Sequence, residues 1–149
     1  MYADAMSQSA LAKKPVTIRL SAEVREEIRD IMRRTGRDFS SIAHEMLEEA
    51  LKMRRIPGIY FTDTPTGRHA HIAGTGLGVW EIVRVYREEN NDWEALRESF
   101  DWLTEQQLRT ALAYAEAYPE EIGDRIALED EFSVEEVWKK YPFTRPPWA

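Results

Sequence analysis

The spacing of hydrophobic positions changes twice within the first third of the chain, and each spacing predicts a different element. Residues 16–20 alternate between apolar and polar side chains, which is typical of a short strand with one buried face. From there the apolar residues recur at helical spacing between Ser21, a good N-cap, and Gly36, a helix stop. A second, wider apolar stripe begins after Asp38 and ends before Pro57. We therefore predict one strand and two amphipathic helices up to about residue 54.

The rest of the chain predicts a hairpin, several short helices and a tail. Two short strands are expected at 59–61 and 68–72, joined by a turn-rich connection over 63–67. Helices are expected from residues 79, 92, 104 and 119, the last of them ending at about residue 128. We expect an α+β fold that is mostly α, divided into a flexible arm over 1–13, a strand-helix-helix module over 14–56, a hairpin and helical domain over 57–128, and an extended tail over 129–149.

The strand-helix-helix module is too small to bury its own apolar positions. A single strand has no hydrogen-bonding partner, and two helices alone leave their stripes open to water. Pairing with the same strand of a second copy would solve both problems and would place Thr17 and Arg19 on the outer face of a two-stranded ribbon. Such a ribbon fits the major groove of DNA, where arginine can bind guanine in bidentate fashion. The sequence therefore predicts a homodimer that reads double-stranded DNA.

The residues VTIRLSAEV, a first helix, the turn TGRDFS and a second helix together resemble the ribbon-helix-helix family of bacterial repressors and antitoxins. The resemblance implies that Thr17, Arg19 and Lys14 read bases. It also implies that the start of the second helix contacts a DNA phosphate, through Phe39, Ser40 and Ser41 with Arg37 beside them. Asp38 departs from this pattern, because a carboxylate at the N-cap repels phosphate.

The stretch IPGIYFTDTPTGRHAHIAGTGLGVWEIVRVY and the later LTEQQLRTALAYAEAYPEEI resemble the domain-of-unknown-function-433 family, which is associated with antitoxins. The resemblance covers about residues 57–128 and implies a helix-turn-helix or winged-helix-like unit, with its helix pair at 92–100 and 105–118. Gln106, Arg109 and Thr110 would then be the outward residues of a second recognition helix. The many carboxylates around them disfavour DNA binding here and favour dimerisation or partner binding.

Charge is distributed unevenly along the chain. Residues 1–58 contain 11 Lys/Arg and 9 Asp/Glu, a net charge of +2, whereas residues 59–149 contain 9 and 18, a net charge of −9. Only the first part is therefore suited to phosphate, and the acidic remainder favours a basic partner.

Large aromatic residues mark the tail. Trp138, Tyr141, Phe143 and Trp148 lie in a segment too short to bury them, and this composition is typical of a partner-binding segment. The alternative is that the tail folds back on the hairpin or on a sister chain. The resemblance to antitoxins implies a toxin as the partner, commonly a ribonuclease.

Candidate catalytic and metal-binding residues are few. The chain has no cysteine and no serine–histidine arrangement that its order would suggest, so we expect no enzymatic activity. His69 and His71 share one side of the second strand, and Asp63 could approach them across the turn. A third firm ligand is not identifiable, so we expect no metal and no cofactor.

Together these patterns predict a cytoplasmic, dimeric transcriptional regulator. We expect it to be the antitoxin of a type II toxin–antitoxin system, which binds operator DNA with its N-terminal ribbon and a toxin with its C-terminal part. No apolar run is long enough to span a membrane. The alternative is a dimeric adaptor that binds other proteins but not DNA.

Overall fold

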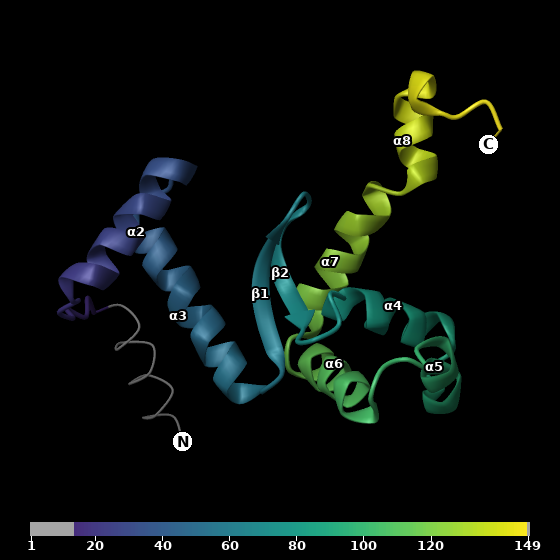
Figure 1. Cartoon of the computed structure of the whole chain (residues 1–149), viewed down its shortest axis with the longest axis horizontal. Helices are drawn as coiled ribbons and strands as arrows, with labels where there is room; N and C mark the ends of the chain where they lie inside the picture. The colour runs from purple at the N-terminus through teal and green to yellow at the C-terminus, as the bar shows by residue number, and fades with distance from the viewer. Residues whose placement is uncertain (1–13, 149) are drawn as a thin grey trace. The chain divides into compact units, whose positions relative to one another are not determined.

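The structure, a computed structural model, describes residues 14–148 (Figure 1). The predicted arm over 1–13 lies outside the described residues. The chain divides into two compact units that meet between Met46 and Leu47, inside helix α3. No helix in the described range is long and apolar enough to cross a membrane.

The N-terminal unit consists of a segment without regular secondary structure, helix α2 (Ala22–Thr35) and the first part of α3 (Phe39–Arg55). Both helices begin and end as the sequence predicts. The Ser21 hydroxyl accepts a hydrogen bond from the amide of Val24 at 3.2 Å, and Gly36 ends α2 with a positive φ of 70°. Asp38 caps α3 by accepting a bond from the amide of Ser41 at 2.7 Å.

The second unit contains a two-stranded antiparallel hairpin, β1 (Ile59–Thr64) and β2 (Gly67–Ile72). Both strands are longer than predicted, because Asp63 and Thr64 pair with Arg68 and Gly67 instead of forming a loop. The turn is therefore reduced to Pro65 and Thr66. It is closed by the Thr64 hydroxyl, which donates to the Gly67 carbonyl at 2.6 Å.

Helices follow the hairpin. They are α4 (Val79–Glu88), α5 (Trp93–Ser99), α6 (Glu105–Ala117), α7 (Pro119–Glu131), α8 (Val134–Lys140) and the 3₁₀ turn η1 (Pro142–Thr144). The helix predicted from residue 104 begins with a capping box between Thr104 and Gln107, with both bonds near 3 Å. Helix α7 is longer than predicted, because an ion pair between Arg125 and Glu129 at 3.1 Å supports its last turns.

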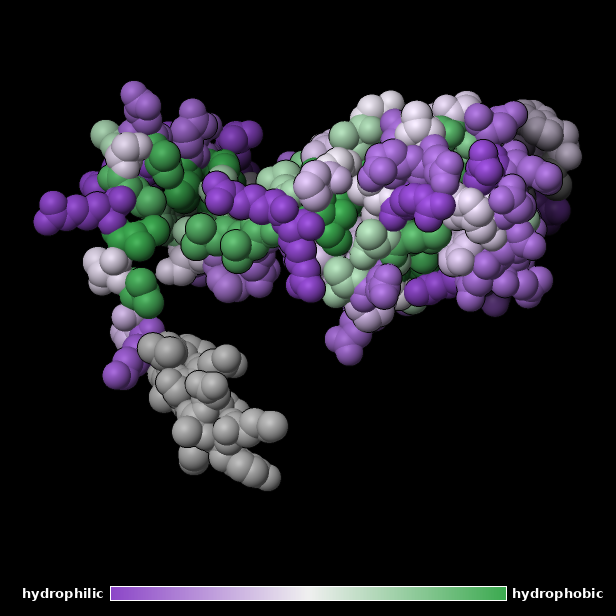
Figure 2. Space-filling view, turned by 90° about the horizontal axis from the view of Figure 1, so that it is seen from below, coloured by the Kyte–Doolittle hydropathy of each residue, from purple (hydrophilic) through white to green (hydrophobic). Residues whose placement is uncertain are grey.

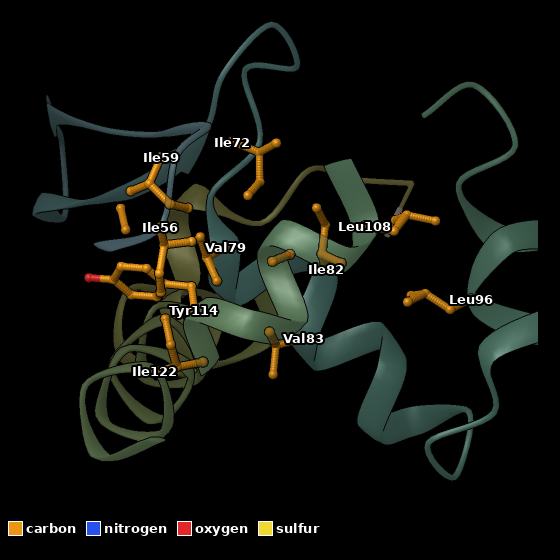
Figure 3. Close-up of a cluster of buried hydrophobic side chains, with 12 residues drawn as sticks. Ile56, Ile59, Ile72, Val79, Ile82, Val83, Leu96, Leu108, Tyr114 and Ile122 are labelled. Carbon is orange, nitrogen blue, oxygen red and sulfur yellow. The ribbon is translucent and has the colours of Figure 1, made fainter. Parts of the chain in front are cut away.

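One hydrophobic core lies between the hairpin and α4, α5, α6 and α7 (Figure 3). Tyr114, Leu96, Val79 and Ile82 are all fully buried in it. This confirms a mostly helical α+β architecture with an antiparallel hairpin.

Candidate functional site

The predicted DNA-reading segment lies fully on the surface. Lys14, Thr17 and Arg19 are exposed, and so are the apolar residues between them, with 84% of Val16 and 61% of Ile18 accessible to water. Residues 15–20 form no strand in the single chain, since a strand exists only when its backbone groups are paired. The intermolecular ribbon therefore stays a prediction.

The helices that follow this segment also leave large apolar side chains in water. In α2 and in the α3 segment of the N-terminal unit, only Ile28 and Ile42 are buried, whereas Val24 is 45% exposed. Along α3, Leu47 and Leu51 are one turn apart and are 56% and 67% exposed. Figure 2 shows hydrophobic side chains gathered on the surface of the N-terminal part. A monomer therefore keeps in water an apolar surface that burial would stabilise.

The predicted phosphate-contacting residues at the start of α3 are partly engaged already. The amide of Ser41 donates to Asp38, and this bond lowers the pKa of the Asp38 carboxyl, which is therefore a carboxylate at neutral pH. Arg37 forms an ion pair with Glu45 at 2.9 Å. The amides of Phe39 and Ser40 lie in the first turn of α3, where a helix offers them no acceptor of its own, and their contact with phosphate stays a prediction.

The prediction that Thr110 points outward from a second recognition helix is wrong. Thr110 is buried, its hydroxyl donates to the Gln106 carbonyl at 2.8 Å, and its methyl group packs over Gly58. Arg109 is exposed, but its guanidinium binds Glu105 at 2.7 Å and lies 4.6 Å from the centre of the Trp93 ring. This face of α6 therefore offers little positive charge to DNA.

The tail residues predicted to bind a partner are largely exposed. Phe143 is 85% and Trp148 87% accessible, and Tyr141 is 44% accessible with its ring edge-on to Phe143. Trp138 is half-buried, with the guanidinium of Arg145 at 5.8 Å from its ring. Rigid aromatic side chains in water are a suitable contact surface for another protein.

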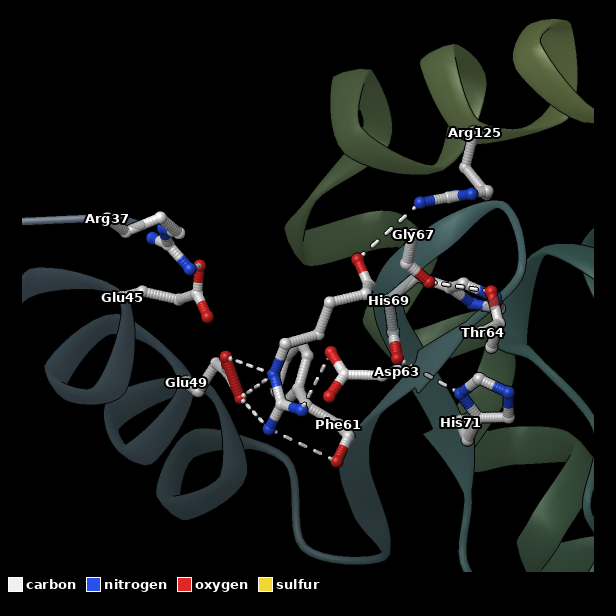
Figure 4. Close-up of polar contacts among 11 residues, drawn as sticks. Arg37, Glu45, Glu49, Phe61, Asp63, Thr64, Gly67, His69, His71 and Arg125 are labelled. Atoms are coloured by element: carbon white, nitrogen blue, oxygen red, sulfur yellow. Dashed lines mark hydrogen bonds and ion pairs between the residues drawn. The ribbon is translucent and has the colours of Figure 1, made fainter. Parts of the chain in front are cut away.

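The two histidines of β2 lie together but without the expected carboxylate (Figure 4). Their rings stack at 4.3 Å, and His71 Nδ1 is 3.0 Å from the His69 carbonyl. Asp63 lies opposite Arg68 instead of approaching them, and it is 3.5 Å from that guanidinium. No group of three metal-ligating side chains occurs among residues 14–148.

Arg68 fixes the edge of the hairpin to α3. Its guanidinium donates to both carboxylate oxygens of Glu49, at 2.8 to 3.0 Å, and this fork-like pairing raises the pKa of Arg68 (Figure 4). The same guanidinium reaches the carbonyl of Phe61.

A pocket of about 270 Å³ opens between β2, the start of α4 and α7. The pattern of the sequence gave no sign of it, because its walls come from three segments far apart in the chain. The spacing of Arg125 and Glu129, four residues apart on one helix, indicates their ion pair but not the pocket. Its lining residues are Arg68, His69, Ala70, Trp80, Glu121, Ile122, Asp124, Arg125 and Leu128.

Burial of His69 in this wall predicts that stability depends on pH. Burial, helped by the positive charge of Arg125, lowers the pKa of His69 from 6.5 to about 4, so the unfolded chain takes up the proton first. The free energy of unfolding should therefore fall as the pH drops from about 6.5 to about 4. Urea unfolding across this range measures it, and a His69→Gln variant, which cannot titrate, should lack this part of the loss. Identical pH profiles for the two proteins would contradict the prediction.

Part of the second unit matches a protein-family model. Residues 62–115 match the family model described as "Protein of unknown function (DUF433)", a stretch that runs from β1 to the end of α6. No curated protein and no solved structure matches the chain.

Proposed function

We propose that this protein is a homodimeric, DNA-binding transcriptional regulator whose N-terminal segments pair across the dimer as a ribbon. The observation that carries the proposal is the exposed alternation of residues 16–20, directly before two helices that bury only Ile28 and Ile42 within the N-terminal unit. A second copy would cover Val16 and Ile18 and leave Thr17 and Arg19 facing the major groove.

We extend the proposal to an antitoxin, in which the second unit and its aromatic tail bind a toxin. Its support is the resemblance of the first segment to antitoxins, the net charge of −9 over residues 59–149, and the exposed rings of Phe143 and Trp148. Toxin binding would then change how much of the operator is occupied.

The direct test is binding of the purified protein to a labelled duplex of DNA from upstream of its own gene. A scrambled duplex of the same composition is the control, and both are titrated at several salt concentrations. We expect tighter binding to the upstream DNA, with affinity that falls steeply as salt rises, because arginine and lysine displace counterions from phosphate. Equal binding to both duplexes would contradict sequence reading.

The amide of Ser41 already donates to Asp38, and Arg37 is paired with Glu45. These contacts favour a second candidate, a dimeric adaptor that does not bind DNA. Both groups would otherwise be available to phosphate. The adaptor predicts an intact dimer with no shift of either duplex at any salt concentration.

Two neighbouring substitutions separate dimerisation from DNA reading. Ile18→Asp would place a charge in the buried face of the ribbon and should yield monomers, because an unpaired carboxylate is costly to bury. Thr17→Asp makes the same change one residue away, on the outer face, and should leave the dimer intact while weakening DNA binding. Sedimentation and the duplex assay measure both properties, and a dimeric Ile18→Asp protein would show that residues 16–20 do not form the interface.

A further inference from the structure

The pocket between β2, α4 and α7 contains several charged groups, but most of them are already neutralised. Arg68 is held by Glu49, and Arg125 donates to Glu129 at 3.1 Å and to the carbonyl of Thr66 at 2.9 Å. Both guanidiniums are therefore already bound by acceptors of this chain.

Glu121 is engaged in the same way. Its carboxylate accepts a hydrogen bond from the hydroxyl of Tyr114 at 2.8 Å and forms an ion pair with Lys52 at 3.2 Å. Asp124 differs, because it is exposed and has no ion pair or hydrogen bond with any part of the chain that the structure describes. The uncompensated charge of the pocket is therefore negative.

Besides the Asp124 carboxylate, the indole of Trp80 is a second group in the pocket that a ligand could contact. It lines the pocket half-buried, beside the ring of His69. Gly78 makes room for it: a Cβ atom there would lie 2.7 Å from the Trp80 ring and 2.9 Å from that of His69. The backbone at this point is thus shaped to bring the two rings together in the wall.

His69 adds a polar but uncharged surface. Its Nδ1 atom is buried and has no hydrogen-bond partner within residues 14–148, and the lowered pKa keeps the imidazole neutral at physiological pH. A neutral ring does not repel a cation. Ala70, Ile122 and Leu128 complete the lining with apolar groups.

We propose that this pocket binds a basic side chain, an arginine in preference to a lysine, presented by a partner protein. Asp124 would pair with the guanidinium, Trp80 would stack on it, and the apolar lining would cover the aliphatic stem. The size agrees, because about 270 Å³ is below the range of roughly 300–1,000 Å³ that is usual for small-molecule and cofactor sites.

The overall charge of this part of the chain is consistent with such a partner. The net charge of −9 over residues 59–149 would attract a basic surface and hold it near the pocket. The proposal refines the partner-binding half of the proposed function and does not depend on DNA binding.

The test uses the full chain and a fluorescein-labelled peptide with arginines spaced by glycine, with a citrulline peptide of the same length as the uncharged match. Binding is followed by anisotropy at low salt, and the indole N–H resonance of Trp80 is followed by NMR. Two variants are compared. Asp124→Asn removes the proposed partner, and Asp101→Asn removes another exposed carboxylate, one that does not line this pocket.

We expect the arginine peptide to shift the Trp80 resonance and the citrulline peptide to leave it unchanged. Asp124→Asn should weaken binding roughly three- to tenfold, as for an exposed ion pair supported by an aromatic face. Asp101→Asn should have a smaller effect. Equal losses in both variants, or an unmoved Trp80 resonance, would show general attraction to an acidic surface and overturn the proposal. Upstream DNA binding, measured on the same Asp124→Asn sample, should be unchanged, so failure here is distinct from failure of DNA recognition.

Discussion

Replacing Arg19 with alanine should lower the affinity for upstream DNA by about a hundredfold or more while leaving the dimer folded. One bidentate arginine–guanine contact discriminates by about 1–3 kcal/mol, and a symmetric dimer loses two of them. The side chain is exposed in the single chain, so its removal takes nothing from the core. Binding is measured by titrating the labelled duplex, and folding by circular dichroism.

The control for Arg19→Ala is Arg87→Ala. Arg87 is also exposed, lies on α4 in the second unit, and its loss changes the net charge by the same amount. If the two variants lose the same modest affinity, the arginine acts only through overall charge, and residues 16–20 do not read bases. A selective loss for Arg19→Ala would also distinguish the regulator from the adaptor.

Elements whose signals are local were predicted well from the sequence. Ser21 and Asp38 cap the helices that follow them, Gly36 ends α2 as expected, and the helix predicted from about residue 92 begins at Trp93. Each of these depends on bonds within one turn of the chain, so a few adjacent residues contain the information.

Features that depend on distant segments were not predictable in the same way. Thr110 was placed outward on the resemblance to a helix-turn-helix unit, whereas the chain near Gly58 covers it. The pocket combines β2, α4 and α7, and no periodicity links Trp80 with Asp124. Long-range contacts of this kind are fixed by packing, which a linear pattern does not encode.

Residues 16–20 are an intermediate case, because the alternation is local but the strand requires a partner. The alternation predicts that Val16 and Ile18 are buried, but in the single chain they are 84% and 61% exposed. The disagreement between an apolar pattern and an exposed position is itself informative, since it identifies a surface that association would cover.

Tyr114→Ala should destabilise the second unit by about 3–5 kcal/mol, the usual cost of removing a buried aromatic side chain. The Tyr114 side chain is fully buried at the centre of the core, edge-on to Phe61 and 4.8 Å from the ring of Tyr118. Its hydroxyl also donates to Glu121, and burial together with this bond raises the pKa of Tyr114, which stays neutral and able to donate.

Two further variants are compared with Tyr114→Ala: one separates the packing of the ring from the hydrogen bond, and the other is a control in the tail. Tyr114→Phe keeps the ring and should cost only about 1 kcal/mol, because Glu121 retains its ion pair with Lys52. Tyr141→Ala removes a half-exposed ring from the tail and should change the free energy of unfolding by less than about 1 kcal/mol. Urea unfolding of all three gives the values. If Tyr114→Phe cost as much as Tyr114→Ala, the hydrogen bond between Tyr114 of α6 and Glu121 of α7, and not the packing of the ring, would account for the stabilisation.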